Sequence, residues 1–294
     1  MEPLIPDRPL RIGEMLVATT RYLRHNAGAT VGVGALLATA TSVIDGVVVN
    51  GVLLGRGQGT ALDRLIAGQT LTAADTQVLV RQVTDAAPLL ALAVAVSMLV
   101  QLAAMGVMTL AMADVLRGQR PTPGTLWGRV PWRRIVGVNI AIVVLELVAS
   151  AVPIAVAFIA GGALGLAAMG LSVVIALSIA VLTALAVPAT VVHGLRVRDA
   201  IARSVLVNRH GALRTAWALL VTVAVWQMLG GFIGNPIGLI VGLLGGGPST
   251  ATGSVLTSLV ANIVSGAIAL PAIAGMTTLI YIDRLRRSGM PDDL

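Results

Sequence analysis

Glu146 is the residue of this chain best placed to carry chemistry. It is the only charged residue between Ile135 and Val192, a run long enough to cross a membrane twice. An ionised carboxylate at the middle of a membrane helix is costly, and such groups usually serve a function. The functional hypothesis is a proton or cation relay, and the structural one is a protonated carboxyl hydrogen-bonded within the protein. Its candidate partners are Asn139, Gln101 and Asn262.

Asp45 and the pair Asn235-Pro236 are further candidates for an intramembrane site. Asp45 lies near the end of the first apolar run, where it is either a polar residue at interface depth or part of a relay. Pro236 lacks a backbone donor and would clash with the carbonyl of Phe232, which predicts a kink or a break in the fifth apolar run. A break would resemble the discontinuous helices of transporter sites, whereas a kink would serve packing only.

Glycines in the fifth apolar run recur at every fourth position, at Gly230, Gly234, Gly238, Gly242 and Gly246. On a helix this spacing predicts one groove without side chains, which another helix or a lipid chain could enter. Gly28 and Gly32 predict a second close helix contact near the start of the first run.

Neither a catalytic residue nor a cofactor or metal site is predicted from the remaining residue types. The chain has no cysteine, and His25, His193 and His210 show none of the spacings typical of metal ligands. Phosphate-binding loops and nucleophile elbows are equally unsupported by the sequence.

The composition is that of an integral membrane protein. Of 294 residues, 56% are hydrophobic and 11% are charged, against about 25% charged in soluble domains. The mean hydropathy is +0.93. The net charge of +7 comes from 20 arginines and no lysine. These arginines adjoin apolar runs, which favours an anionic lipid surface as the partner and not nucleic acid.

Two basic, amphipathic segments repeat one another. In 196–214 and 11–27, Arg196 corresponds to Arg11, Asp199 to Glu14, and Ser204 to Thr19. Residues 1–26 are therefore expected to contain a cytoplasmic helix, which either lies in the membrane interface or packs on the helix bundle. Asp199 stands four residues before Arg203, which predicts a helical ion pair. The expected contacts with anionic lipid are Arg11, Arg21, Arg24, Arg196, Arg198, Arg203, Arg209 and Arg214.

Arginine counts predict how the chain crosses the membrane. The two termini and the connections 114–134 and 193–214 hold 17 of the 20 arginines, and the other three lie in 50–87. Arginine-rich connections stay in the cytoplasm, so both termini are expected there, in a bacterial cell membrane. We expect an all-α polytopic membrane protein with six transmembrane helices as three hairpins, each preceded by a basic interfacial segment. The expected spans are 27–49, 88–112, 135–160, 163–190, 215–244 and 255–281, with a turn at Gly161-Gly162, a helix start at Thr122-Pro123 and a cytoplasmic tail at 282–294.

Several short motifs resemble those of a known family. They are Arg8-Pro9-Leu10 with Gly13-Glu14, then Pro188, Gly194, Ala200 and Arg203-Ser204, and finally Tyr281, Asp283 and Arg286-Arg287. This set is similar to membrane proteins of high-GC Gram-positive bacteria that resemble the membrane domain of some glycerophosphodiester phosphodiesterases. His193 departs from it, since an acidic residue is expected there. The resemblance implies a six-helix membrane domain without the catalytic barrel.

Three classes of function follow. The first is a non-catalytic scaffold with a membrane-protein partner or a second copy of itself. The alternative is a small transporter or lipid-handling protein using Glu146 and a broken fifth span. An intramembrane enzyme is the third, and no motif supports it.

Overall fold

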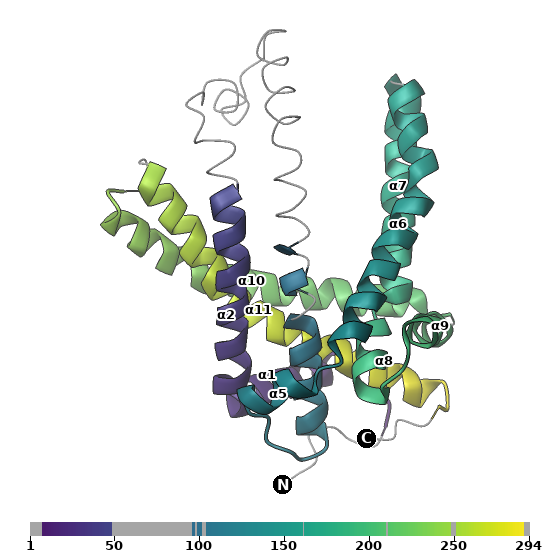
Figure 1. The fold of residues 1–294 in the computed structure, drawn as a ribbon, viewed down its shortest axis with the longest axis horizontal. Helices are drawn as coiled ribbons and strands as arrows, with labels where there is room; N and C mark the ends of the chain where they lie inside the picture. Colours follow the sequence, from purple (N-terminus) through teal and green to yellow (C-terminus); the bar gives the residue numbers. More distant parts are fainter. Residues whose placement is uncertain are drawn as a thin grey trace. The chain divides into compact units, whose positions relative to one another are not determined.

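The computed structural model describes residues 8–48, 96–97, 99–101, 104–160, 162–209, 211–247 and 251–290 (Figure 1). In this part of the chain the regular structure is entirely helical. Among the described residues, five helices are long and apolar enough to cross a membrane, or six if α1 and α2 are counted as one bent span. The protein is therefore a multi-pass membrane protein.

The chain divides into two compact units. Unit 1 comprises residues 1–34, 102–229 and 267–294, and unit 2 comprises residues 35–101 and 230–266. Among the helices labelled in Figure 1, those that contribute to both units are α2 (Ala27–Val48), α10 (Ala212–Leu244) and α11 (Ala251–Arg287).

The helices of unit 1 follow the predicted order. The first basic segment forms α1 (Ile12–His25), and residues 104–116 are helical before α5 (Pro123–Arg129), which begins after Thr122 as predicted. A hairpin follows, of α6 (Trp132–Ala160) and α7 (Gly162–Thr183), with the expected turn at Gly161 outside the described residues. The short helices α8 (Ala186–His193) and α9 (Val197–Asn208) complete the unit, and α9 packs on α6, α7 and α8.

The two basic segments that repeat in sequence begin their helices at corresponding residues. Arg11 is the residue before α1 and Arg196 the residue before α9. Thr19 and Ser204, which also correspond, are both completely buried. The repeat therefore describes two helices that each bury one face against the protein.

The fourth span is interrupted, contrary to the prediction of one helix over 163–190. Residues 184–185 form a turn between α7 and α8. Pro188 has no N–H, so it cannot bond the carbonyl of Ala184, and its ring crowds that carbonyl. The turn is stabilised from α9, where Ser204 Oγ donates to Leu182 O (2.6 Å) and accepts from the Leu185 N–H (3.2 Å).

The fifth span is a single continuous helix, so of the two alternatives predicted for Asn235-Pro236, a kink or a break, the break is wrong. α10 runs through Pro236 as a single helix, and Asn235 and Pro236 are both exposed on it. Proline costs a membrane helix one backbone hydrogen bond, which the rest of the helix can tolerate.

The glycine ladder of α10 is filled by α11 within unit 2. A Cβ built on Gly234 would lie 2.5 Å from the carbonyl oxygen of Ala261, and one on Gly230 would lie 3.0 Å from the carbonyl oxygen of Ser265. Gly238 faces the carbonyl oxygen of Thr257, and Gly242 faces the Thr257 side chain and the carbonyl oxygen of Gly253. Gly246 is not part of the ladder, because α10 ends at Leu244 and Gly246 forms a turn with a φ of 100°. The groove is thus a helix-packing surface.

In unit 1 the core lies where α1 meets α10 and α11. Trp226 packs with Ala269 and Ala272, and Leu16 and Leu23 of α1 cover them. The Tyr22 ring lies against Gly275, and its hydroxyl donates to Met108 O (3.3 Å). Gly28 and Gly32 have no atom within 4 Å of an added Cβ among the described residues, so the close helix contact predicted there is not made within this part of the chain. Gly34 instead approaches Ala267.

Candidate functional site: a polar network joining the arginine-rich ends

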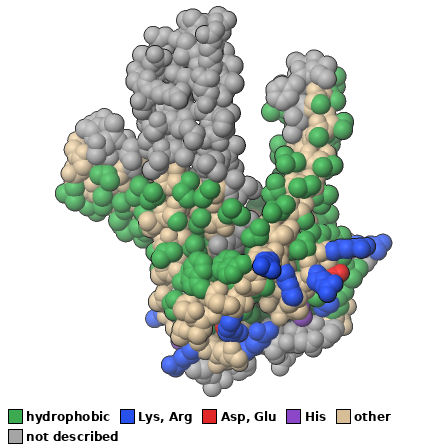
Figure 2. Space-filling model, viewed as in Figure 1, with side chains coloured by type: hydrophobic (Ala, Val, Ile, Leu, Met, Phe, Trp, Pro, Cys, Tyr) green, Lys and Arg blue, Asp and Glu red, His purple; other side chains and the backbone are tan. Residues whose placement is uncertain are grey.

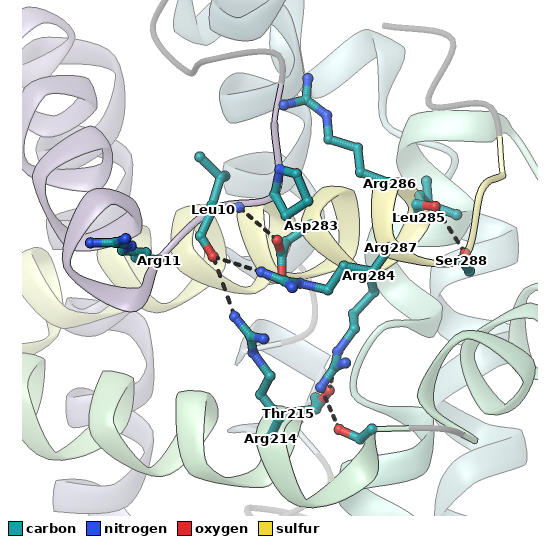
Figure 3. Close-up of polar contacts among 12 residues, drawn as sticks. Leu10, Arg11, Arg214, Thr215, Asp283, Arg284, Leu285, Arg286, Arg287 and Ser288 are labelled. Carbon is teal, nitrogen blue, oxygen red and sulfur yellow. Dashed lines mark hydrogen bonds and ion pairs between the residues drawn. The ribbon is translucent and has the colours of Figure 1, made fainter.

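The N-terminal segment is fastened to the end of α11 (Figure 3). The Leu10 N–H donates to Asp283 Oδ1 (2.7 Å), and Arg287 Nη2 donates to Leu10 O (3.2 Å). Arg287 Nε also pairs with Asp283 Oδ2 (2.8 Å). Arg214, at the start of α10, reaches the same Leu10 carbonyl (3.5 Å). Three segments far apart in the sequence therefore meet at one backbone unit.

An exposed ion pair lies beside this contact. Arg8 pairs with Glu14, and the N–H of Arg11 donates to Glu14 Oε2 (2.9 Å). The backbone hydrogen bond from Arg11, with help from the Arg8 guanidinium, holds the pKa of the Glu14 carboxyl below its ordinary value.

A second chain of hydrogen bonds runs from α11 to the turn between α7 and α8. Arg284 Nε donates to Thr215 Oγ1 (2.9 Å), and a guanidinium nitrogen of Arg284 donates to Gly211 O. Thr215 in turn donates to Asn208 Oδ1 (2.8 Å), and Asn208 Nδ2 donates to Val181 O (3.1 Å). Arg284, Thr215 and Asn208 are buried.

In this chain of hydrogen bonds, side-chain donors satisfy backbone carbonyls at the turn between α7 and α8. The carbonyls of Val181 and Leu182 lose their helical partners at the turn, and buried carbonyls must be hydrogen-bonded. Asn208 and Ser204 supply the missing donors. The network holds the interrupted helix, α9, α10 and α11 in one arrangement, and this role is structural.

Arginines of the 114–134 connection also join unit 1 together. Asp114 is nearly buried and forms a two-point ion pair with Arg129, at 2.7 and 3.0 Å. Trp127 and Trp132 stack with ring centroids 5.3 Å apart. Arg117 Nη2 donates to Val192 O (3.3 Å), which ties this connection to the end of α8.

Glu146 lies midway along α6 and is half-buried. In the described part of the chain it takes part in no hydrogen bond or ion pair. The predicted bond to Asn139 is not made, because Asn139 Nδ2 donates to Ile135 O (2.8 Å) in its own helix. Gln101 and Asn262, the other two partners considered, belong to unit 2.

The surroundings of Glu146 are apolar and open. Leu147 is 64% exposed and Val148 is 68% exposed, and hydrophobic side chains cover the α6–α7 hairpin in Figure 2. Glu146, the residue that the sequence indicates as best placed to carry chemistry, is therefore not part of the polar network that joins the arginine-rich segments.

The other predicted residues are dispersed. Asp45 belongs to α2, but its side chain is outside the described part of the chain, as is all of His210. Of the arginines predicted to contact lipid, Arg203 is half-buried, and the exposed ones are Arg11, Arg21, Arg24, Arg196, Arg198, Arg209 and Arg214. Arg203 turns towards Tyr281, and among the described ion pairs there is none to Asp199, so that prediction is wrong.

Sequence reasoning missed Asn208, Thr215 and Arg284. Polar residues one or two turns from a membrane span are common, and nothing in their spacing indicates that they meet. The sequence singles out Ser204 only in the repeat of the two basic segments and in the family-like motifs, and Asp283 only in those motifs. A signal was present in Pro188, which predicts a carbonyl without a partner near Ala184 and hence a polar residue elsewhere to satisfy the turn.

In comparisons with known proteins, no family model matches the chain, and no curated protein or solved structure matches it.

Proposed function

We propose that this chain is a non-catalytic scaffold of a bacterial cell membrane, and that its α6–α7 hairpin docks a transmembrane helix of a partner protein beside Glu146. The observation that supports this is the position of Glu146, half-buried on an apolar hairpin and without a polar partner among the described residues. A charged side chain at the centre of a membrane helix costs about 2.5–3.5 kcal/mol. A partner helix with a hydrogen-bond donor at the same depth would remove that cost.

The buried polar residues of unit 1 fit the same role. Asn208, Thr215 and Arg284 bond one another and backbone carbonyls, so their hydrogen-bonding capacity serves the arrangement of helices. Such a rigid base would hold a docking hairpin in a fixed position.

We also propose the layout of six spans in three hairpins, with both termini in the cytoplasm. It is supported by the contacts that bring Leu10 to Asp283, Arg117 to Val192, and Arg284 to Gly211. These contacts gather the arginine-rich segments of unit 1, as the rule of cytoplasmic positive charge requires.

We further propose that the chain is a member of the family of high-GC Gram-positive membrane proteins that its motifs resemble. In its support, the two ends of the family-like motif set meet, since Arg286 Nη1 donates to Arg8 O (3.4 Å) and Arg287 to Leu10 O.

The alternative of a transporter or lipid-handling protein has less support. It relied on a broken fifth span and an open glycine groove, whereas α10 is continuous and α11 occupies the groove. Glu146 is the observation that still supports transport or lipid handling, so the experiment has to distinguish that function from the docking of a partner helix.

The test uses a photo-crosslinking residue at Val148, beside Glu146, with the exposed Leu220 of α10 as the control position. We expect Val148 to crosslink one membrane protein of defined mass, and Glu146→Leu to abolish that crosslink while the thermal stability is unchanged. Crosslinks that form equally in Glu146→Leu would contradict the proposal, and a crosslinked dimer of the chain would replace it by self-association. Cation or proton flux in reconstituted vesicles that Glu146→Gln abolishes would replace it by transport.

A further inference from the structure

Guanidinium groups bond the backbone on both sides of His193 at the end of α8. Val192 O accepts from Arg117 Nη2 (3.3 Å), and Gly194 O accepts from Arg134 Nη1. Between them, His193 Nδ1 lies 3.1 Å from the hydroxyl of Tyr281. α8 ends here, with Gly194 in the left-handed conformation at a φ of 63°.

Arg203 adds a third guanidinium to this cluster from α9. Its guanidinium lies beside the Tyr281 side chain. Its Nε atom is buried, and among the described residues it has no hydrogen-bond partner. Arg117 and Arg134 therefore bond the residues on either side of His193, and Arg203 lies beside Tyr281, which contacts His193. We call these three arginines the α8 arginine cluster.

The charge of the α8 arginine cluster is not balanced by paired acids. Asp114 pairs with Arg129 and Asp283 with Arg287, and Asp199, one turn before Arg203 on α9, is exposed and forms no ion pair with it among the described residues. Among the described ion pairs, none involves a member of the cluster. The end of a helix carries only about half a negative charge, so α8 cannot neutralise three cations.

The location of the cluster indicates which anion would reach it. The apolar span that begins at Ala167 ends at His193, so the cluster lies where hydrocarbon gives way to headgroups. In Figure 2 arginine side chains lie at the base of the α6–α7 hairpin, below its hydrophobic surface. Guanidinium groups bind phosphate oxygens at two points, and each has donors left after bonding one carbonyl.

We infer that the α8 arginine cluster is a binding site for the phosphodiester of an anionic lipid headgroup. Arg117 and Arg134 use one donor each on the end of α8 and present the remainder to the phosphate. The site is independent of the partner proposed for Glu146, which lies midway along α6.

The probe is phosphatidylglycerol, added to the purified full-length protein in neutral detergent, with phosphatidylcholine as the uncharged comparison. Lipid affinity is measured by native mass spectrometry and by the rise in melting temperature. We expect phosphatidylglycerol to bind preferentially, and Arg117→Gln with Arg134→Gln to weaken it at least about tenfold, the effect of losing a charge-assisted hydrogen bond.

Matched controls are Arg198→Gln with Arg209→Gln, two exposed arginines of α9 that the sequence also predicts to contact anionic lipid but that lie outside the cluster, so they separate a built site from general surface attraction. They should leave the affinity within about twofold, because a screened surface charge contributes little. An equal loss in both double variants would overturn the site and leave only general attraction to a basic surface.

Two further arms complete the test. Inorganic phosphate at millimolar concentration should not reproduce the rise in melting temperature, and if it did, the ligand would be free phosphate and not lipid. If the double variant fails to fold, Arg134→Lys keeps the charge but loses the two-point geometry, and an affinity unchanged from wild type would contradict the inference.

Discussion

Asp283 gives the sharpest quantitative prediction of this structure. Its side chain is 3% exposed and accepts two hydrogen bonds, from the Leu10 N–H and from Arg287 Nε. Asp283→Asn keeps the size of the side chain but replaces one acceptor oxygen by an NH₂ donor. Whichever way the amide turns, it then faces either the Leu10 N–H or the Arg287 Nε–H donor to donor.

The expected loss follows from those two bonds. A hydrogen bond to a charged group contributes about 1.5–3 kcal/mol. The Arg287 side chain is 30% exposed, so water screens part of the ion pair and its share is discounted. We expect Asp283→Asn to lower the free energy of unfolding by about 2–3 kcal/mol, which corresponds to a fall in melting temperature of roughly 5–10 °C.

The assay combines thermal unfolding in detergent with hydrogen exchange of the segment around Leu10. In the wild-type protein the Leu10 amide is bonded and buried, so it should exchange slowly, and Asp283→Asn should make it exchange much faster. Glu14→Gln is the matched control. Glu14 also accepts from the N-terminal segment, but it is exposed, so its loss should be much smaller. Equal effects of the two substitutions, or unchanged protection of Leu10, would refute the reasoning.

Three more predictions follow from buried contacts. Gly234→Ala should lower the free energy of unfolding by about 1–3 kcal/mol, because its Cβ would lie 2.5 Å from Ala261 O. The control Gly231→Ala, whose Cβ would have no atom closer than 3.7 Å, should be neutral or slightly stabilising in thermal unfolding. Asn208→Ala should lower the free energy of unfolding by about 2–3 kcal/mol in thermal unfolding, because it removes hydrogen bonds to Val181, Leu182 and Thr215. Its control is Ser178→Ala, which should change the unfolding free energy little, because Ser178 is exposed and bonds only its own helix. In a double-mutant cycle, Pro188→Ala should reduce the loss of unfolding free energy that Asn208→Ala causes. The reason is that an alanine N–H could bond the Ala184 carbonyl and favour a continuous helix. Strictly additive losses of unfolding free energy would show that Pro188 does not cause the turn.

Helix positions could be predicted because hydrophobic length dominates them. α2 follows the expected span 27–49 closely, and α5 begins at Pro123, where a proline fits the first turn. α11 continues to Arg287, past the expected end at 281, because the bonds of Asp283 and Arg284 order residues that otherwise resemble a tail.

The two prolines show why the candidate site could not be predicted. Pro188 accompanies an interruption and Pro236 does not, although both lack an N–H. Near Pro188, Ser204 and Asn208 offer hydrogen bonds to the freed backbone groups, whereas Pro236 lies on an exposed face of α10. The outcome depends on partners about 20 residues or more away in the sequence, which local spacing does not contain.

The central claim is that the arginine-rich segments share one side of the membrane, and cysteine labelling tests it most directly. The chain has no cysteine, so Gln119→Cys, Ser288→Cys and Gly162→Cys can each be introduced singly and treated in cells with a membrane-impermeant maleimide. The account predicts that Gln119→Cys and Ser288→Cys are labelled only after the membrane is opened, while Gly162→Cys, at the far end of the α6–α7 hairpin, is labelled in intact cells. Labelling of Gln119→Cys and Ser288→Cys from opposite sides would contradict it.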